Sequence, residues 1–76
     1  MSEELEVDAR GLLCPLPVLR LRKRMAPLAP GARVRLLADD PMAEVDVPHF
    51  CAEAGHRMLG SEPAGDHTIY RLAKGG

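Results

Sequence analysis

The sequence predicts an α/β (α+β) fold, a two-layer βαβαββ sandwich in which two helices cover one face of a mixed four-stranded sheet. Three observations predict it. Short segments that alternate polar and apolar residues occur next to segments with helical spacing, Pro- and Gly-containing breaks separate them, and the early strands carry charges on one face. With 76 residues, the chain has room for a single domain spanning 1–76.

Two strands are expected in the first half of the chain. Residues 4–8 alternate polar and apolar, so Leu5 and Val7 should face the core. Residues 32–38 follow a Pro-Gly break and alternate before they become fully apolar. The alternate positions of both strands hold charged residues, which are Glu4, Glu6, Arg33 and Arg35. One face of the sheet should therefore be solvated, and both helices should pack on the other.

Two helices are expected, one after each of these strands. Apolar residues recur at near-helical spacing after Cys14 and predict a first helix over about 15–27. A second helical stretch follows to about Gly55, and Pro48 interrupts it. Proline removes a helical hydrogen bond, so an irregular turn is expected first and a firmer helix over 48–54.

The last two strands, about 57–62 and 67–72, are expected to form a hairpin. Residues 63–66, Pro-Ala-Gly-Asp, provide the turn between them. The connection between the first two strands contains a helix, so these strands should be parallel and joined by a right-handed crossover.

The overall charge and composition exclude several function classes. The formal charge is −1, which gives no general attraction to nucleic acid or to an anionic membrane. No apolar run is long enough to span a bilayer, and the first residues are acidic where a secretory signal would be basic. We therefore expect a cytoplasmic monomer that binds neither nucleic acid nor membrane directly.

The segment that joins the first strand to the first helix carries the candidate chemistry. Cys14 stands just before the helix, where free backbone N–H groups and the helix dipole favour an anion, so its thiol pKa is expected to be depressed. A single thiolate can accept sulfur from a persulfide and pass it on, whereas a dithiol catalyst needs a resolving cysteine nearby. The other cysteine, Cys51, lies on a different predicted element. The alternative for Cys14 is a buried, inert thiol.

The residues around Cys14 have predicted supporting roles. Pro15 and Pro17 would start the helix and stiffen the chain after the thiol, and Gly11 would permit a tight turn. Arg10 is expected either to steady an anionic sulfur or to hold the loop by hydrogen bonds to carbonyls, and Asp8 is interpreted as structural.

The full pattern D-x-R-G-x-x-C-P-x-P resembles the signature of the TusA family of sulfur carriers, also called SirA or YhhP. In this chain its members are Asp8, Arg10, Gly11, Cys14, Pro15 and Pro17. The likeness continues through Arg22-Lys23, through residues 38–41 and through residues 48–51, and so covers nearly the whole chain.

The resemblance implies the βαβαββ fold and a sulfur-carrier function, with a transient covalent persulfide on Cys14 and no resident cofactor. It implies a cysteine desulfurase or a rhodanese as sulfur donor and a second protein as acceptor, in tRNA thiolation, molybdenum cofactor supply, sulfur oxidation or selenium metabolism. Leu16 stands where members of the tRNA relay often have Glu, so the resemblance does not select that relay.

Other features have two interpretations each. Arg20, Arg22, Lys23 and Arg24 make the first helix basic, either as a partner-docking face or as solvated cations near a helix C-terminus. Cys51 is expected to be buried and inert. His49 and Cys51 could act as metal ligands, but no third and fourth ligand stand at suitable spacing, and His56 and His67 lie on separate predicted elements, so no metal is expected.

The terminal Gly75-Gly76 also ends the ubiquitin-like carriers, but their strand order differs from the one predicted here, so a frayed tail is expected. Two alternative functions remain open from the residues alone, a thiol-based regulatory protein and an RNA-binding module. Against RNA binding stand the slightly negative charge and the lack of a GxxG loop.

Overall fold

The computed structural model describes residues 4–76, which form one sheet and two helices. The elements are, in chain order, β1 (Glu4–Asp8), α1 (Leu16–Met25), β2 (Arg33–Ala38), α2 (Ala43–Ala54), β3 (Arg57–Ala64) and β4 (His67–Ala73). The predicted order of strands and helices is confirmed. Neither helix is long and apolar enough to cross a membrane within this described part of the chain.

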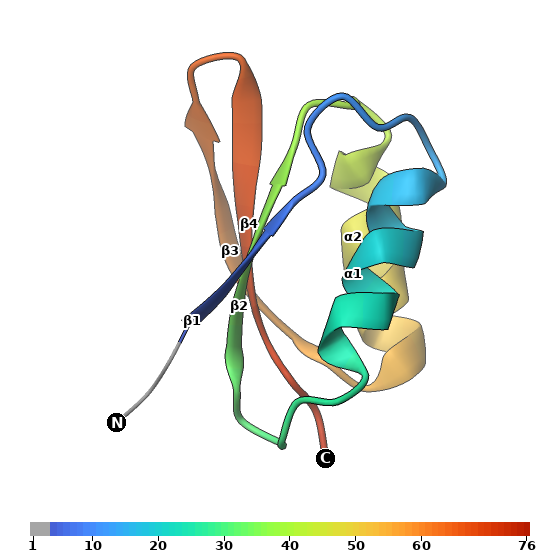
Figure 1. The fold of residues 1–76 in the computed structure, drawn as a ribbon, viewed down its shortest axis with the longest axis vertical. Coiled ribbons are helices and arrows are strands. Elements are labelled where there is room, and N and C mark those ends of the chain that lie inside the picture. The colour runs from blue at the N-terminus through green and yellow to red at the C-terminus, as the bar shows by residue number, and fades with distance from the viewer. Residues whose placement is uncertain (1–3) are drawn as a thin grey trace.

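The sheet has the strand order β1-β2-β4-β3. β1 and β2 are parallel, as predicted for a crossover connection, and β4 pairs antiparallel with both β2 and β3. Both helices lie on the same face of the sheet (Figure 1). On the open face, ion pairs join Glu6 to Arg35 and Glu62 to Arg71 across neighbouring strands. These charged side chains explain why that face can remain in water.

The core lies between the sheet and the helices and is mostly aliphatic. Leu21 and Met25 project from α1 one helical turn apart and are fully buried. They meet alternate residues of the strands, because successive side chains of a strand point to opposite faces. The buried strand residues in this cluster are Val7, Val34, Leu36, Ala38, Tyr70 and Leu72.

The expected irregular turn before Pro48 is wrong, because α2 is one continuous helix from Ala43. Proline leaves the carbonyl of the residue four positions earlier, Glu44, without its helical donor. Pro48 and Glu44 are both exposed, so water can reach that carbonyl. Buried side chains before and after the proline, Val47 and Phe50, fix the helix to the sheet on both sides.

The hairpin is longer and its turn tighter than predicted. Only Gly65 and Asp66 separate β3 from β4, and Gly65 has a φ of 72°. Pro63 was expected in the turn but pairs with Thr68 within the ladder. Since β3 is an edge strand, proline is tolerated there without costing a hydrogen bond to another strand.

The expected frayed tail is wrong for Gly75, because Lys74 and Gly75 are docked, whereas Gly76 is exposed. The Lys74 ammonium donates to the carbonyls of Met25, Ala26 and Leu28 at the end of α1, at 3.0, 3.3 and 3.0 Å. The Gly75 N–H donates to His56 Nδ1 at 3.0 Å. A Cβ on Gly75 would overlap the Gly55 carbonyl. The segment after β4 therefore closes the end of the helix layer.

Candidate functional site

Cys14 lies exposed in the loop between β1 and α1, two residues before the helix begins at Leu16. Pro15 is the N-cap residue of α1, and its carbonyl accepts the first helical hydrogen bond, from the Leu19 N–H at 3.1 Å. Pro17 is buried in the first turn. The two prolines therefore hold the thiol at the start of the helix, as the sequence predicted.

The loop before Cys14 is anchored to the neighbouring β2–α2 loop at the same end of the sheet (Figure 1). Gly11 has a φ of 80°, a conformation that favours glycine, and this turns its N–H toward Asp39. That N–H lies 3.0 Å from both carboxylate oxygens of Asp39. The predicted tight turn at Gly11 is thus present.

Arg10 pairs with Asp8, two residues away along the chain. Its Nε and a terminal guanidinium nitrogen donate to the two Asp8 oxygens at 3.0 Å each, and its backbone N–H donates to the same carboxylate. The hydrogen bonds from the Arg10 side chain and backbone lower the pKa of Asp8 to about 2. Of the two predicted roles for Arg10, these contacts match the one that holds the loop, but the acceptor is the Asp8 carboxylate and not a backbone carbonyl as expected.

Two carboxylates converge on Cys14 from the β2–α2 loop and from α2. The Cys14 thiol donates to Asp46 Oδ2 at an Sγ–Oδ2 distance of 2.8 Å, and the Cys14 backbone N–H donates to Asp40 Oδ2. Asp40 also accepts the Met42 N–H through its other oxygen at 3.1 Å. The thiol therefore faces negative groups, although it stands at a helix N-terminus.

The predicted depression of the Cys14 pKa is wrong in sign. The hydrogen bond to Asp46, loss of hydration and the negative charges of Asp46 and Asp40, in that order of size, raise the pKa of the thiol. A helix N-terminus favours an anion by only about 0.3–1 kcal/mol. A carboxylate in direct contact with the sulfur outweighs that effect, so the thiol is held neutral.

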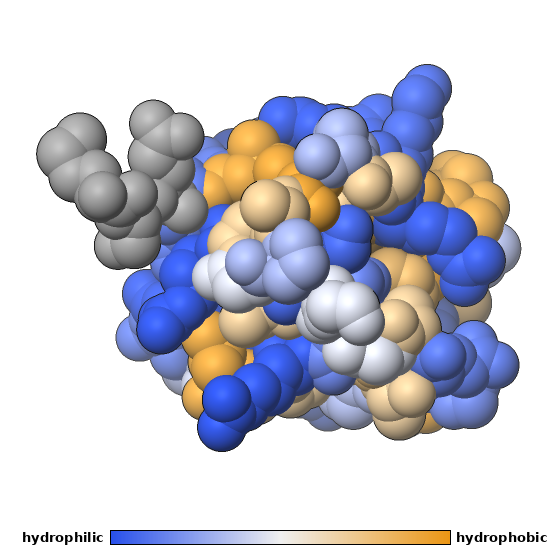
Figure 2. All heavy atoms as spheres, turned by 90° about the horizontal axis from the view of Figure 1, so that it is seen from below, coloured by the Kyte–Doolittle hydropathy of each residue, from blue (hydrophilic) through white to orange (hydrophobic). Residues whose placement is uncertain are grey.

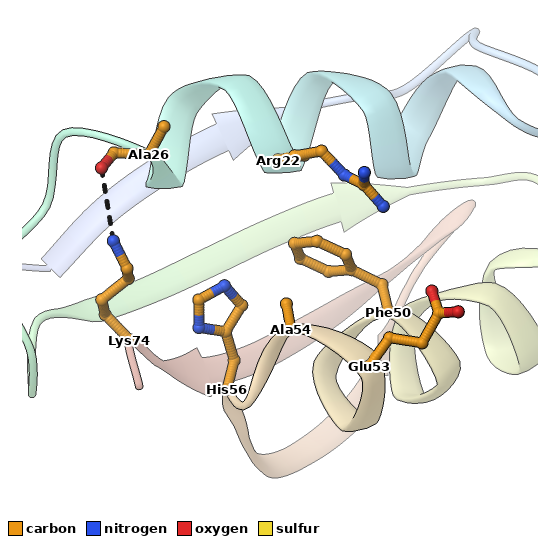
Figure 3. Close-up of a pocket in the computed structure, with 7 residues that line it drawn as sticks. All are labelled: Arg22, Ala26, Phe50, Glu53, Ala54, His56 and Lys74. Carbon is orange, nitrogen blue, oxygen red and sulfur yellow. Dashed lines mark hydrogen bonds between the residues drawn. The ribbon is translucent and has the colours of Figure 1, made fainter. Parts of the chain in front are cut away.

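A shallow hollow of about 180 Å³ adjoins the thiol, between α1 and α2. Its lining includes Cys14, Asp46 and His49. A second hollow of about 500 Å³ continues toward the far end of the helices (Figure 3). Both are lined by Arg22, Phe50 and Glu53, so the two hollows adjoin. In the close-up, the Arg22 guanidinium lies over the Phe50 ring, 5.3 Å from its centroid.

The basic residues of α1 divide into two groups. Arg20 donates to the Asp8 carbonyl at 2.9 Å, and Arg22 lies on Phe50, so both are engaged within the protein. Lys23 and Arg24 are exposed, and within residues 4–76 neither side chain forms a hydrogen bond or an ion pair. A partner-docking role for this helix stays a prediction, and it applies best to Lys23 and Arg24.

The remaining candidate residues have structural surroundings. Cys51 is buried in the core, as expected, and burial raises the pKa of its thiol. His49 lies 3.6 Å from Glu53 one turn along α2, and His67 contacts Asp66 at 2.9 Å. Within residues 4–76, no three potential ligand side chains gather in a way that would hold a metal ion.

Residues 5–74 match the family described as Sulfurtransferase TusA. The chain belongs to the TusA family. The sulfur carrier protein TusA of Pseudomonas entomophila (strain L48) is 38% identical over 68 residues, which cover 90% of this chain and 85% of that protein. A crystal structure of a SirA-like protein from Desulfitobacterium hafniense superposes with a TM-score of 0.81 at 25% identity, covering 95% of this chain and 99% of that one. The TusA-family resemblance inferred from the sequence is therefore confirmed.

Sequence reasoning did not find Asp46. The sequence places Asp46 in the expected irregular turn before Pro48, which the structure does not have. The continuous helix from Ala43 places Asp46 next to Cys14, which lies 32 positions earlier in the sequence. No local sequence pattern predicts such a contact.

Proposed function

We propose that this TusA-family sulfur carrier carries its sulfur as a persulfide on Cys14. The observation that supports this most is exposure, because Cys14 is exposed whereas Cys51, the other cysteine of the chain, is buried. Sulfur exchange needs direct contact between two sulfur atoms of different proteins. Cys14 alone meets that requirement.

In loading, Cys14 Sγ attacks the outer sulfur of a donor persulfide. A new S–S bond forms at Cys14, the S–S bond of the donor breaks, and the inner sulfur of the donor leaves as a thiolate that takes up the proton lost by Cys14. In delivery, an acceptor thiolate attacks the outer sulfur and Cys14 Sγ is the leaving group. Both steps conserve the oxidation level of the system, so neither needs an oxidant or a reductant.

The surface around Cys14 supports a protein as the exchange partner. Large apolar side chains are exposed on the loop and on the first turns of both helices. They are Leu13, Leu16, Leu19, Met42 and Val45, here called the apolar rim. On the opposite end of the molecule, seen in Figure 2, hydrophilic residues lie between the apolar patches. Apolar residues in such a cluster are typical of protein–protein contacts.

The proposed donor is a cysteine desulfurase or a rhodanese, and the acceptor is a second protein. A cytoplasmic location, a monomeric state and the absence of direct binding to nucleic acid or membrane stay predictions from the sequence. The end pathway depends on partner surfaces, which this chain does not contain.

The test is incubation with a purified cysteine desulfurase and cysteine, followed by intact-mass measurement. Wild type and Cys51→Ser should each gain the mass of one sulfur atom, and Cys14→Ser should gain none. Thermal unfolding of each variant controls for loss of the fold. Loading that survives Cys14→Ser, or that requires Cys51, would contradict the proposal.

A further inference from the structure

Cys14 combines two properties that work against each other in a sulfur carrier. Its side chain must be exposed in order to reach a partner, and exposure also opens it to oxidants and stray electrophiles. Such reactions require the thiolate form. An exposed thiol can therefore be protected only by keeping its proton, and the Asp46 carboxylate at 2.8 Å is placed to do that.

Asp46 differs from Asp40 in what it holds. Both oxygens of Asp40 accept backbone N–H groups, from Cys14 and from Met42, so Asp40 fixes the loop. Asp46 is half-buried on α2, and within residues 4–76 its carboxylate accepts a hydrogen bond from no side chain other than the Cys14 thiol. Removing the Asp46 interaction would free the thiol without releasing the loop.

The other charged groups near the thiol do not replace Asp46. His49 and Glu53, on α2, line the same hollow and contact each other. Arg22, on α1, lines it too, but its guanidinium lies on the Phe50 ring. No cation within residues 4–76 forms an ion pair with Asp46. A cation for this carboxylate must then come from another molecule.

We propose that Asp46 is a latch on Cys14, which holds the thiol neutral in the free carrier and is released by a cationic side chain of the docking partner. This inference rests on the proposed function of Cys14. The partner surface would present apolar groups to the apolar rim, where Leu13 and Val45 are 70% and 61% exposed. At its centre it would place a Lys or Arg next to its exchanging sulfur. Pairing with Asp46 would break the contact with Sγ, and the freed thiol would give up its proton more readily, through solvent, to the thiolate that leaves the donor.

The latch explains how a carrier can discriminate between correct and incorrect reaction partners. A small electrophile brings no cation to Asp46 and meets a neutral thiol. A docked partner brings both the cation and the sulfur, so activation and transfer occur together. Selectivity then resides in the complex and not in the free protein.

The first experiment measures the alkylation rate of Cys14 by iodoacetamide against pH in the free protein. Asp46→Asn and Asp46→Ala should both react faster at neutral pH, by about threefold or more, and should reach their plateau at lower pH. The matched control is Glu44→Gln, which removes the same charge from the first turn of α2 without touching the thiol. Unchanged or slower alkylation in both Asp46 variants would overturn the latch.

The second experiment compares two sulfur donors, glutathione persulfide and a cysteine desulfurase. Wild type should favour the enzyme strongly, and Asp46→Asn should load faster from glutathione persulfide while its preference for the enzyme falls. An unchanged or increased preference would overturn release by the partner. If no variant, wild type included, gains sulfur from either donor, the proposed function fails, whereas the alkylation rates still decide whether Asp46 restrains the thiol.

Discussion

Replacing Lys74 by Met should destabilise the protein, because the Lys74 ammonium caps the C-terminal end of α1. Without the ammonium, the Met25 carbonyl still accepts a hydrogen bond from the Leu28 N–H at 3.0 Å. The part-buried Leu28 carbonyl loses its hydrogen bond from Lys74, and this accounts for most of the destabilisation. A hydrogen bond from a charged donor contributes about 1.5–3 kcal/mol. A cation at a helix C-terminus adds about 0.3–1 kcal/mol. The free energy of unfolding should therefore fall by about 2–4 kcal/mol.

Thermal unfolding followed by circular dichroism measures this change. For a domain of this size, 1 kcal/mol corresponds to about 4–8 °C, so Lys74→Met should lower the Tm by about 8 °C or more. The control is Lys23→Met, which removes an exposed cation from α1 itself and should change the Tm by less than about 4 °C. Equal Tm values for the two variants would refute the capping role of Lys74.

Three further predictions concern the core and the loop. Cys51→Ser should lower the free energy of unfolding by about 1–3 kcal/mol, because it places a hydroxyl in an apolar core. Sulfur loading on Cys14 should continue. An unchanged Tm with lost loading would show that Cys51 takes part in transfer. Asp8, with a pKa of about 2, should contribute stability that is complete above its ordinary value of 3.8 and is lost as the pH falls through about 2. Arg10→Ala should return the Asp8 pKa toward 3.8, as followed by the carboxyl chemical shift, and should leave the Cys14 pKa unchanged. A Cys14 pKa that moves with Arg10 would contradict the loop-holding role.

The elements that depend on local patterns were predictable from the sequence. Alternation identified β1 and β2, and the Cys-Pro segment located the start of α1 and the candidate thiol. Pro48 was misleading, because a local rule about proline ignores packing. Val47 and Phe50 hold the helix in place on both sides of it, and no single-residue preference contains that information.

The chemical state of the site was not predictable, because it depends on contacts between distant segments. The helix terminus near Cys14 is visible in the sequence, but Asp46 reaches the thiol from 32 positions away. Lys74 reaches the Met25 carbonyl from 49 positions away, and Gly75 packs on Gly55. Each contact requires the relative positions of two elements, which only the folded chain defines.

The central claim is that Cys14 bears the transferred sulfur, and fragment mass spectrometry tests it most directly. The wild-type chain is loaded by a cysteine desulfurase, its persulfide is trapped with an alkylating agent, and the peptides are sequenced by fragmentation. The account predicts the additional sulfur on the fragment that contains Cys14 and an unmodified Cys51. Additional sulfur on Cys51, or on neither cysteine, would contradict it.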